Sequence, residues 1–439
     1  MGGANSKLAD FSLMKFSTPF SVLIWFLINI ASSSNVLALE LKSAYISLDQ
    51  YLEIVKQNNA YIGSAALDLQ TANANKVSQS LYQLNPSISY SRGAYRNQSA
   101  YPTDNTPPSS TYGLSFTVEG WGKRSARENL AQAQIEASAN QLDQTSTNIE
   151  LNALYAYIDS LRLSLMVKSF QEALVKLKPL QGNVKALDAQ RFLTMQKANN
   201  EEDFSFSSLN LLNYSGGAIK EIPAPRGSLN YRIQDYNVEE LIAQGQSQRM
   251  EVINLQSSIE VADKNMTLTM QNRNVNIYPY ISQTRTPQYK YSNGTSYSLP
   301  AIGPLPAQTI SNQGTTYTAA NSITAGVTIP IPITNFLQTA DIVTAANQKL
   351  QYEMQLKDLK EQIRVQVLQA SMRYSAAARR LGNAQKEYED TVKNPNKNPV
   401  LAIMDTRDKE GTLLDAKTNH LKALINLWRQ SGNYSVPTL

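Results

Sequence analysis

The apolar residues of this chain recur with two different periods. Two long stretches, 123–178 and 335–393, contain no proline and place apolar side chains three and four positions apart, a spacing typical of coiled-coil helices. At about 1.5 Å per residue, each stretch predicts a helix about 80–90 Å long. In the second, the predicted packing positions are Ile363, Val367, Ala370, Tyr374, Ala377, Leu381, Ala384 and Tyr388.

Breaks follow both long stretches. Shorter helical stretches, 184–212 and 400–429, come after them, and we expect each to run back antiparallel along its long partner. Helices of about 25 residues also precede the strands described next. Each long helix is therefore predicted to be flanked by two short helices that stack end to end.

Apolar and small polar residues alternate in shorter stretches, at about 86–119 and about 275–333. Tyr112, Leu114 and Phe116, for example, interleave with Gly113 and Ser115. This period of two predicts strands with one apolar and one polar face, as in a membrane β-barrel, although a soluble half-buried hairpin has the same pattern. The Tyr-, Ser- and Gly-rich stretches 96–110 and 291–317 are predicted to be exposed loops between paired strands.

The order helix, strand pair, long helix and return helix occurs twice. We assign a first structural repeat to 39–217, a connecting segment to 218–247, a second repeat to 248–432 and a tail to 433–439. Phe116-Thr117-Val118 matches Val327-Thr328-Ile329, 211 positions later, and Asp188 matches Asp405, 217 positions later. This period is far too long for a solenoid and indicates a duplicated half-molecule.

The N-terminus predicts export. A basic residue, Lys15, precedes the apolar run Val22–Ala31, and the small residue Ala38 offers a cleavage site, so residues 1–38 read as a signal peptide. Met14 fits the true start codon better than Met1. Gly2 with Ser6 formally matches a myristoylation motif, but beside an export signal this match is best explained by chance.

The composition argues against several classes of function. The net charge of +5 is spread without a dense basic block, which disfavours nucleic-acid binding. The chain has no cysteine and one histidine, His420, which we place at a solvated or capping helix position. No nucleophile–base pair, metal-spaced cluster or phosphate loop appears, so no catalysis and no cofactor are expected.

Two features favour strands in a membrane. Eleven of the 23 tyrosines lie in 81–119 and 275–330, and the second window contains no Asp or Glu. Four strands cannot enclose a pore, because open edges in lipid leave backbone groups unsatisfied. At least two chains must therefore contribute, and three would give twelve strands.

Several motifs resemble the outer-membrane efflux protein family, the TolC-like exit ducts. Leu187-Asp188-Ala189-Gln190-Arg191 is similar to the start of the family's return helix, and the turn at Gly120, Gly122 and Arg124 to its passage from strand into long helix. The resemblance covers nearly all of the mature chain. It implies an α+β membrane protein: a homotrimer in which a twelve-stranded β-barrel in the outer membrane of a Gram-negative bacterium joins a long periplasmic α-helical barrel.

The resemblance also implies partners, namely a periplasmic adaptor (membrane-fusion) protein and an inner-membrane pump or ABC transporter. Cargo would pass through the duct without being chemically changed, and the duct would close at the periplasmic helix tips. Drugs, metals and secreted proteins all remain possible cargoes, since the pump selects them. The alternative is a secreted coiled-coil protein without a pore, which explains the helices but not the strands.

Residues at the helix tips follow from the same resemblance. Asp405 matches an acidic position that rings the closed aperture, and Asp188 is its counterpart in the first repeat. Ala402 stands where a second acidic residue is often found, and Asn398 where a latching Arg would lie. The resemblance therefore implies either a weaker latch or one that uses Lys393, Lys397 or Arg407 instead. Both aspartates have a plainer interpretation as helix caps or solvated groups. The other tip and adaptor-docking candidates are Pro179, Gly182, Lys393, Pro395, Lys397 and Pro399.

Overall fold

The computed structural model describes residues 45–81, 85–93, 109–180, 184–220, 223–292, 296–299, 308–311, 314–331 and 339–438. The predicted signal peptide, Gly182 and the predicted start of the second long helix at residue 335 lie outside these ranges. The chain forms two compact units that cut across the predicted repeats. Unit one comprises Met1–Asn59 with Ala153–Ser228, and unit two comprises Ala60–Asn152 with Leu229–Leu439.

Unit one is mainly helical. In chain order it contains β1 (Tyr45–Ser47), α2 (Leu48–Asn58), the C-terminal part of α4 (Lys123–Leu177), the short 3-10 helix η1 (Lys178–Leu180), α5 (Val184–Tyr214) and β4 (Ala224–Arg226). β1 and β4 pair in parallel, and Ser47 begins α2 with a capping box that Gln50 completes. Its fully buried side chains come from β1, α2, α4 and α5 and include Ile46, Tyr51, Tyr157, Ile158, Leu193 and Leu211.

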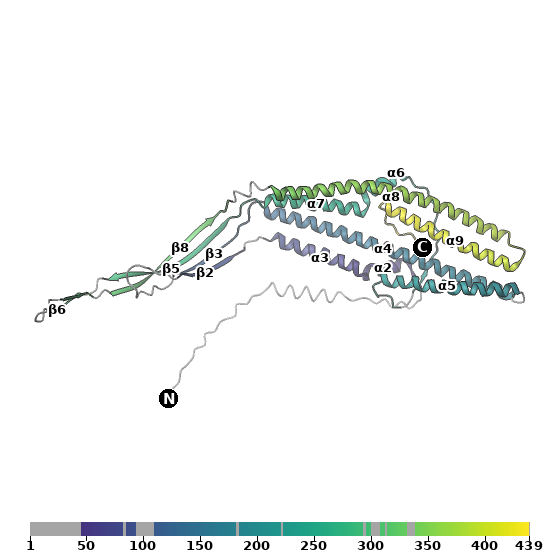
Figure 1. Ribbon diagram of the computed structural model, residues 1–439, viewed down its shortest axis with the longest axis horizontal. Coiled ribbons are helices and arrows are strands. Elements are labelled where there is room, and N and C mark those ends of the chain that lie inside the picture. The colour runs from purple at the N-terminus through teal and green to yellow at the C-terminus, as the bar shows by residue number, and fades with distance from the viewer. Residues whose placement is uncertain are drawn as a thin grey trace, which may run out of the picture. The chain divides into compact units, whose positions relative to one another are not determined.

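The helices of unit two form a layer with a defined order. They are α3 (Ala60–Ser80), the N-terminal part of α4, α6 (Val238–Gln248), α7 (Met250–Gln271), α8 (Ala340–Lys393) and α9 (Pro399–Gln430). Side-chain hydrogen bonds link α3 to α4 (Lys76 to Gln132, 2.7 Å), α4 to α7 (Asn140 to Ser257, 2.6 Å) and α7 to α8 (Lys349 to Asp263, 2.8 Å). The order across the layer is therefore α3-α4-α7-α8 (Figure 1).

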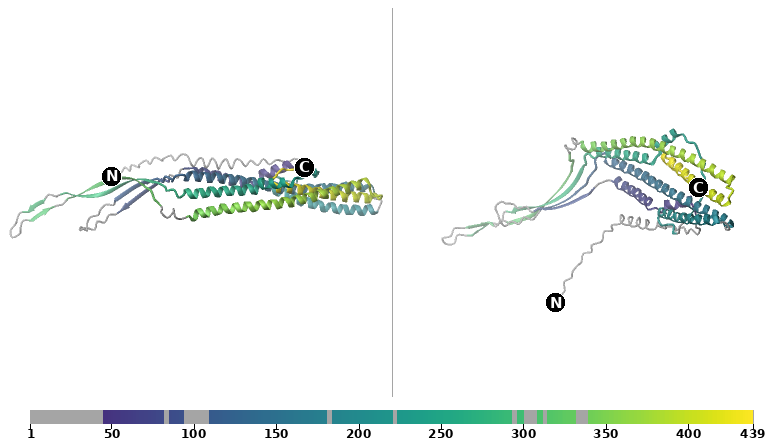
Figure 2. Two further views of the ribbon diagram at one scale, coloured as in Figure 1. Left: turned by 90° about the horizontal axis from the view of Figure 1, so that it is seen from above. Right: turned by 45° about the vertical axis from the view of Figure 1, so that its right-hand side comes forward.

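The strands of unit two repeat this order. β2 (Ser87–Gly93), β3 (Ser109–Ser115), β5 (Tyr278–Ser292) and β8 (Gly314–Thr328) form an antiparallel sheet in the sequence β2-β3-β5-β8. Each strand leads into or out of the helix with the matching place in the layer, and both further views show β5 and β8 side by side (Figure 2). Beyond Ser115 the pairing of β3 with the β5 segment continues through a hydrogen bond from the Phe116 N–H to the Pro279 carbonyl (3.0 Å) and an isolated bridge between Val118 and Ile277.

The prediction of an exposed loop over 291–317 was wrong in part. β5 continues to Ser292 and β8 starts at Gly314, and a further hairpin pairs β6 (Ser296–Leu299) with β7 (Gln308–Ser311). The prediction relied on turn-forming residues, whereas antiparallel pairing uses backbone groups that every residue except proline supplies. Of the stretch 96–110, Ser109 and Ser110 already belong to β3, and 96–108 lie outside the described residues.

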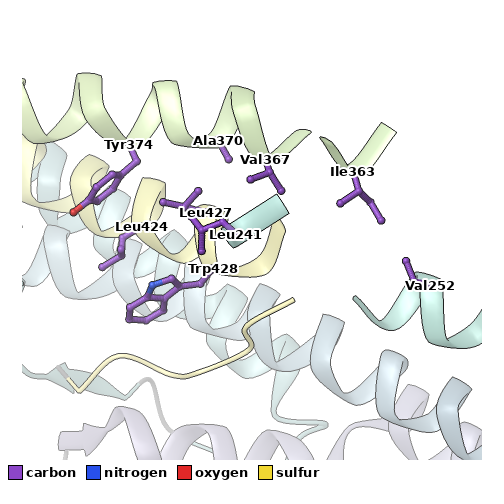
Figure 3. Packing of buried hydrophobic residues seen from close by; sticks show 9 residues of the cluster. All are labelled: Leu241, Val252, Ile363, Val367, Ala370, Tyr374, Leu424, Leu427 and Trp428. Carbon is purple, nitrogen blue, oxygen red and sulfur yellow. The ribbon is translucent and has the colours of Figure 1, made fainter. Parts of the chain in front are cut away.

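The apolar spacing in the second long helix correctly predicted its packing. The buried residues of α8 are Ala345, Ile363, Val367, Ala370, Tyr374, Ala377, Leu381 and Ala384. α9 runs antiparallel along the C-terminal half of α8, and α7 along its N-terminal half, as predicted. Where α6, α7 and α9 meet the middle of α8, Ile363, Val367 and Trp428 belong to one apolar cluster (Figure 3).

The expectation of a solvated His420 was wrong. Its side chain is 1% exposed, and its ring lies against that of Tyr374, with 5.3 Å between centroids and 37° between planes. The four-residue spacing of His420 from Leu424 places it on the face of α9 that packs on α8. Burial lowers the pKa of this imidazole, so the neutral form predominates in the folded chain.

The correspondence between the halves extends upstream of residue 248. α2 and α6 each have 11 residues, and each is followed by one extended residue, Asn59 or Arg249, before the next helix begins. All of α6 except its last residue, Gln248, thus lies in the segment 218–247 that the sequence assigned to a connection. Each long helix also carries a tyrosine, Tyr157 or Tyr374, whose hydroxyl bonds to the backbone of that segment.

The two tyrosines bond in the same way. The Tyr157 hydroxyl donates to the Arg226 carbonyl (2.8 Å) and accepts from the Arg226 N–H (3.0 Å) in unit one. The Tyr374 hydroxyl donates to the Gln234 carbonyl (2.8 Å) and accepts from the Gln234 N–H (2.9 Å) in unit two. Burial raises the pKa of Tyr157 to about 12 and also raises the pKa of Tyr374. Both hydroxyls therefore remain protonated donors.

Candidate functional site

The four-stranded sheet of unit two has one apolar face. The strand register aligns Ile88, Leu114, Ile281 and Ala325 in one row across all four strands. The next row on this face contains Tyr90, Tyr112, Gln283 and Ile323, and the Tyr90 and Tyr112 rings are 5.1 Å apart. Ile88 is 86% exposed and Ile323 73% exposed, so the part of the chain that the structure describes places no covering layer on this face.

The opposite face carries hydroxyl groups. Ser91, Thr111, Thr284 and Ser322 form one row, and the Thr111 and Thr284 hydroxyl oxygens are 3.1 Å apart. Glycines occur where a larger side chain would collide. A Cβ on Gly326 would lie 2.6 Å from the Tyr280 hydroxyl, because the Tyr280 ring covers that position. The sheet therefore presents lipid-like chemistry on one side and water-like chemistry on the other.

Both edges of this sheet are open in the single chain. Among the described strands, β2 pairs only with β3, and β8 pairs only with β5. The outward backbone N–H and C=O groups of β2 and β8 are thus available to a further strand. The helices that adjoin these edge strands, α3 and α8, also lie at the two ends of the helical layer. The same two sides of unit two are therefore open along both layers.

A polar groove crosses the helical layer. It has a volume of about 620 Å³ and is lined by α3, α4, α7 and α8, all in unit two. Of its fourteen lining residues only Asp68 carries a charge, and the polar remainder supplies hydroxyl and amide groups: Thr71, Asn75, Gln134, Ser138, Ser258, Asn265, Gln348 and Tyr352. Uncharged polar groups form hydrogen bonds with water in the groove but do not bind an ion tightly.

The strand-to-helix turn at Gly120 and Gly122 is tightly built. Gly120 is buried, and a Cβ there would lie 2.7 Å from the Val275 carbonyl oxygen. Gly122 has φ +82°, a conformation that favours glycine. The Gly120 N–H and the Lys123 ammonium both donate to the Asn276 amide oxygen, at 3.0 and 2.8 Å. The second repeat thereby fixes the turn of the first.

An ion pair beside this turn was not foreseen from the sequence. Arg127, one turn into α4, donates both terminal nitrogens to the Glu119 carboxylate. Arg124, the predicted arginine of the turn, is exposed instead. The signal that could have found the pair is the spacing between Glu119 and Arg127, which brackets the glycines and brings the two side chains to the same side of the first helical turn.

The turn between α8 and α9 contains several predicted tip residues. The Asn398 amide oxygen accepts from the N–H groups of Val400 (3.0 Å) and Leu401 (3.4 Å), and Pro399 begins α9. Asn398 therefore caps the helix at the position where the resemblance implied an arginine. Asp405 is exposed and accepts a hydrogen bond from the Asn396 side chain at 3.4 Å.

The remaining tip candidates belong to different units of the chain. Lys393 pairs with Glu389 (3.8 Å) one turn earlier in α8, while Pro395 and Lys397 are exposed in the same turn of unit two. Arg407 is half-buried, and burial lowers the pKa of its guanidinium. Asp188 is exposed near the start of α5, and Pro179 lies in η1, both in unit one.

Within the described ranges, no group of three or more His, Cys, Asp or Glu side chains is placed to hold a metal ion. In the same part of the chain, no helix is both long enough and apolar enough to cross a membrane.

Sequence comparison and structure comparison give different answers. No family model matches the sequence, and no curated protein matches it significantly. Solved structures do match. A membrane protein from Pseudomonas aeruginosa superposes with a TM-score of 0.60 at 16% identity, over 88% of this chain and 93% of that chain.

Two further matches are described by their function or location. The outer membrane protein VceC from Vibrio cholerae has a TM-score of 0.57 at 14% identity, over 88% of this chain and 96% of its own. The Campylobacter jejuni CmeC outer membrane channel has a TM-score of 0.58 at 12% identity, over 88% and 85%. Since the match spans nearly the whole described chain, the protein has the fold of these outer-membrane proteins.

Proposed function

We propose that the protein is an outer-membrane exit duct, which conducts cargo passively from an inner-membrane pump across the periplasm and the outer membrane. The observation that carries this proposal is the two-faced sheet with two open edges. A sheet that is apolar on one side, hydroxyl-rich on the other and unpaired at both ends is suited to lipid outside and water inside once its edges are closed.

Closure requires further copies of the chain. Four strands are too few for a barrel, since barrels in membranes have eight or more, and three copies give twelve. In this homotrimer, β2 of one copy pairs with β8 of the next, and α3 lies beside the neighbour's α8. The helices then form the periplasmic barrel, with the polar groove of each copy facing the lumen.

The partners follow from the proposed role. A duct without catalytic groups needs a separate source of energy, which an inner-membrane pump or ABC transporter supplies through a periplasmic adaptor protein. The fold matches outer membrane channels at low identity, which supports the location in the outer membrane with the helices in the periplasm. Tripartite efflux and type I secretion both fit, and uncharged hydroxyl and amide groups suit drugs, metals or proteins as cargo.

The gate is proposed at the turn between α8 and α9. Three copies of Asp405 around one axis would form a ring of carboxylates, which favours cations and resists close approach of the three chains. Asp405 is exposed and lies in the second turn of α9, so its carboxylate is accessible to such an arrangement. Asp188 is the proposed counterpart of Asp405 in the first repeat.

The first test is the native mass of the detergent-extracted mature protein, corrected for bound detergent. We expect a trimer. Because the chain contains no cysteine, a disulfide can also test the edges: one cysteine replaces Ser89 in β2 and another replaces Ser322, Thr324 or Thr328 in β8. Oxidation should give covalent trimers for the pairs in register. As control, Ser89→Cys with Gly113→Cys, which are partners within one sheet, should give monomers only.

A stable monomer with no cross-link at any β8 position would refute the duct and favour the secreted coiled-coil protein. The gate is tested separately by conductance in planar bilayers. Asp405→Ala should raise the resting conductance, while the matched control Asp408→Ala, also exposed and one turn further along α9, should not. Unchanged conductance in Asp405→Ala would remove this residue from the aperture.

A further inference from the structure

One aromatic side chain stands exposed where the sheet ends. Trp121 follows Val118, the last bridged residue of its strand, by three positions and precedes α4 by two. It is 94% exposed, the largest exposed fraction of any large apolar side chain in the described residues. An indole of this size in water is unfavourable, and a soluble part of a protein would normally bury it.

The turn presents Trp121 rigidly. Its backbone carbonyl accepts a hydrogen bond from the Asn274 side chain (2.5 Å), and the N–H of the preceding Gly120 donates to Asn276 (3.0 Å). On the other side, a Cβ on Gly122 would lie 2.6 Å from the Gln271 side-chain oxygen. Since the backbone is held in place on both sides of Trp121, the folded turn itself keeps this side chain exposed.

The chemistry changes along the chain at this residue. The apolar face of the sheet ends just before it, in the row that contains Val118 and Ile277. Lys123 and the exposed Arg124 follow it by two and three positions. Apolar strand, indole and basic side chain is the order in which these groups occur from a bilayer core through its interface into water, where the indole has apolar and polar neighbours at once.

We propose that Trp121 lies in the interfacial layer of the outer membrane on its periplasmic side, with its indole among the lipid glycerol and headgroup regions. The partner is thus the lipid surface, and the contact sets how deeply the strand-to-helix turn sits. This inference rests on the proposed function, because it requires strands that cross the membrane.

Fluorescence tests the proposal, since the chain has only three tryptophans and Trp25 lies in the predicted signal peptide. Wild type and Trp121→Phe are reconstituted into phosphatidylcholine vesicles with bromine at shallow or deep acyl positions. The difference between the two proteins isolates Trp121. We expect bromine to quench most of this difference signal, more with shallow than with deep bromine. The signal left in Trp121→Phe comes from Trp428, which is 9% exposed in the helical core, and should not be quenched.

Two variants in the Trp121→Phe background calibrate depth. Tyr112→Trp, on the apolar face of β3, should be quenched best by deep bromine, and Met372→Trp, exposed on α8, should not be quenched. If the protein resists carbonate extraction from vesicles and conducts ions, but Trp121 is not quenched, the inference fails and the duct stands. If the protein does not insert at all, the proposed function fails and the inference falls with it.

Discussion

Each half of the chain ends its return helix in the same Ser-Gly turn, called the helix joint below. The side chain that packs beside this joint is neutral in unit one and charged in unit two. In unit one, Ser215 is fully buried, its hydroxyl donates to the Leu212 carbonyl (2.8 Å), and Gly216 follows with φ +62°. In unit two, Ser431 is fully buried, its hydroxyl donates to the Trp428 carbonyl (2.8 Å), and Gly432 follows with φ +78°. Both pairs end a return helix, 216 positions apart.

The residues opposite these glycines differ. In unit one, the Asn59 side chain donates to the Tyr214 carbonyl at 3.1 Å. In unit two, the corresponding Arg249 is 7% exposed and donates to Gln366, Gln430 and the Glu251 carboxylate. Burial alone would raise the pKa of Glu251, but the hydrogen bonds and charge of Arg249 hold it below its ordinary value. The shared backbone geometry thus tolerates different side chains, and the glycine is the common requirement.

The largest effect is expected at Gly216. A Cβ there would collide with the Asn58 carbonyl oxygen, and the positive φ adds strain, so Gly216→Ala should lower the free energy of unfolding by about 3 kcal/mol. Gly217→Ala is the matched control: it has φ +81° but nothing within 4 Å, so about 1 kcal/mol is expected. Thermal unfolding in detergent at one protein concentration measures both. Equal losses would show that the contact with Asn58 is unimportant.

The next effect separates the charged joint from the neutral one. Arg249→Ala removes three partners and leaves Glu251 and two amides without their donor, which should cost about 2–3 kcal/mol. Asn59→Ala removes a neutral hydrogen bond to a carbonyl and should cost about 1 kcal/mol. The same unfolding measurement compares them. A smaller loss for Arg249→Ala than for Asn59→Ala would mean that the charged network is no stronger than one neutral bond.

A smaller effect is expected where the tyrosines bond the connecting segment. Tyr157→Phe and Tyr374→Phe each leave one N–H and one C=O without this partner, at a cost of about 1–2 kcal/mol. Tyr157 should cost more, because it is fully buried and its single hydrogen is shared between the carbonyls of Arg226 and Ile46, each 2.8 Å from the hydroxyl oxygen. Amide hydrogen exchange at Arg226 and Gln234 gives a local readout. Unchanged exchange at both would show that the hydroxyls do not hold the segment.

The smallest effect concerns acid. Burial lowers the pKa of His420 in the folded chain, so as the pH falls the unfolded chain takes up this proton at a higher pH than the folded chain does. The free energy of unfolding therefore falls as the pH drops below about 6.5, by at most about 1.4 kcal/mol per pH unit. The position 216 residues earlier is Phe204, which does not titrate. His420→Phe should therefore remove this part of the acid sensitivity while keeping an aromatic ring against Tyr374. An unchanged slope between pH 6.5 and 5.5 would assign the acid sensitivity to other groups.

The sequence predicted the elements that depend on local periodicity. Helical spacing found α8 and its buried face from Ile363 to Ala384, and alternation found the strands around Leu114 and Ile281. Both periods follow directly from backbone geometry. The resemblance to exit ducts agrees with the fold of the solved structures, although it could not place Asp405 relative to other copies.

What the sequence did not predict depends on contacts between distant residues. Asn276 binds a turn 156 positions away, and no local pattern indicates this partner. His420 was misplaced because one histidine has no period of its own. The joints do carry a local signal, since Ser-Gly follows a helical stretch at both 215–216 and 431–432.

The pairing of β3 with β5 has a consequence for how the chain folds. Ser110 of β3 pairs with Arg285 of β5, so 175 positions separate these partners, and β3 must wait for its second neighbour to be made. Pairings of such long sequence separation form slowly, and an unpaired strand edge is prone to aggregate while it waits. The first hairpin must therefore remain soluble until β5 is available, which makes a holding chaperone more important for this sheet than for a sheet built only from consecutive hairpins.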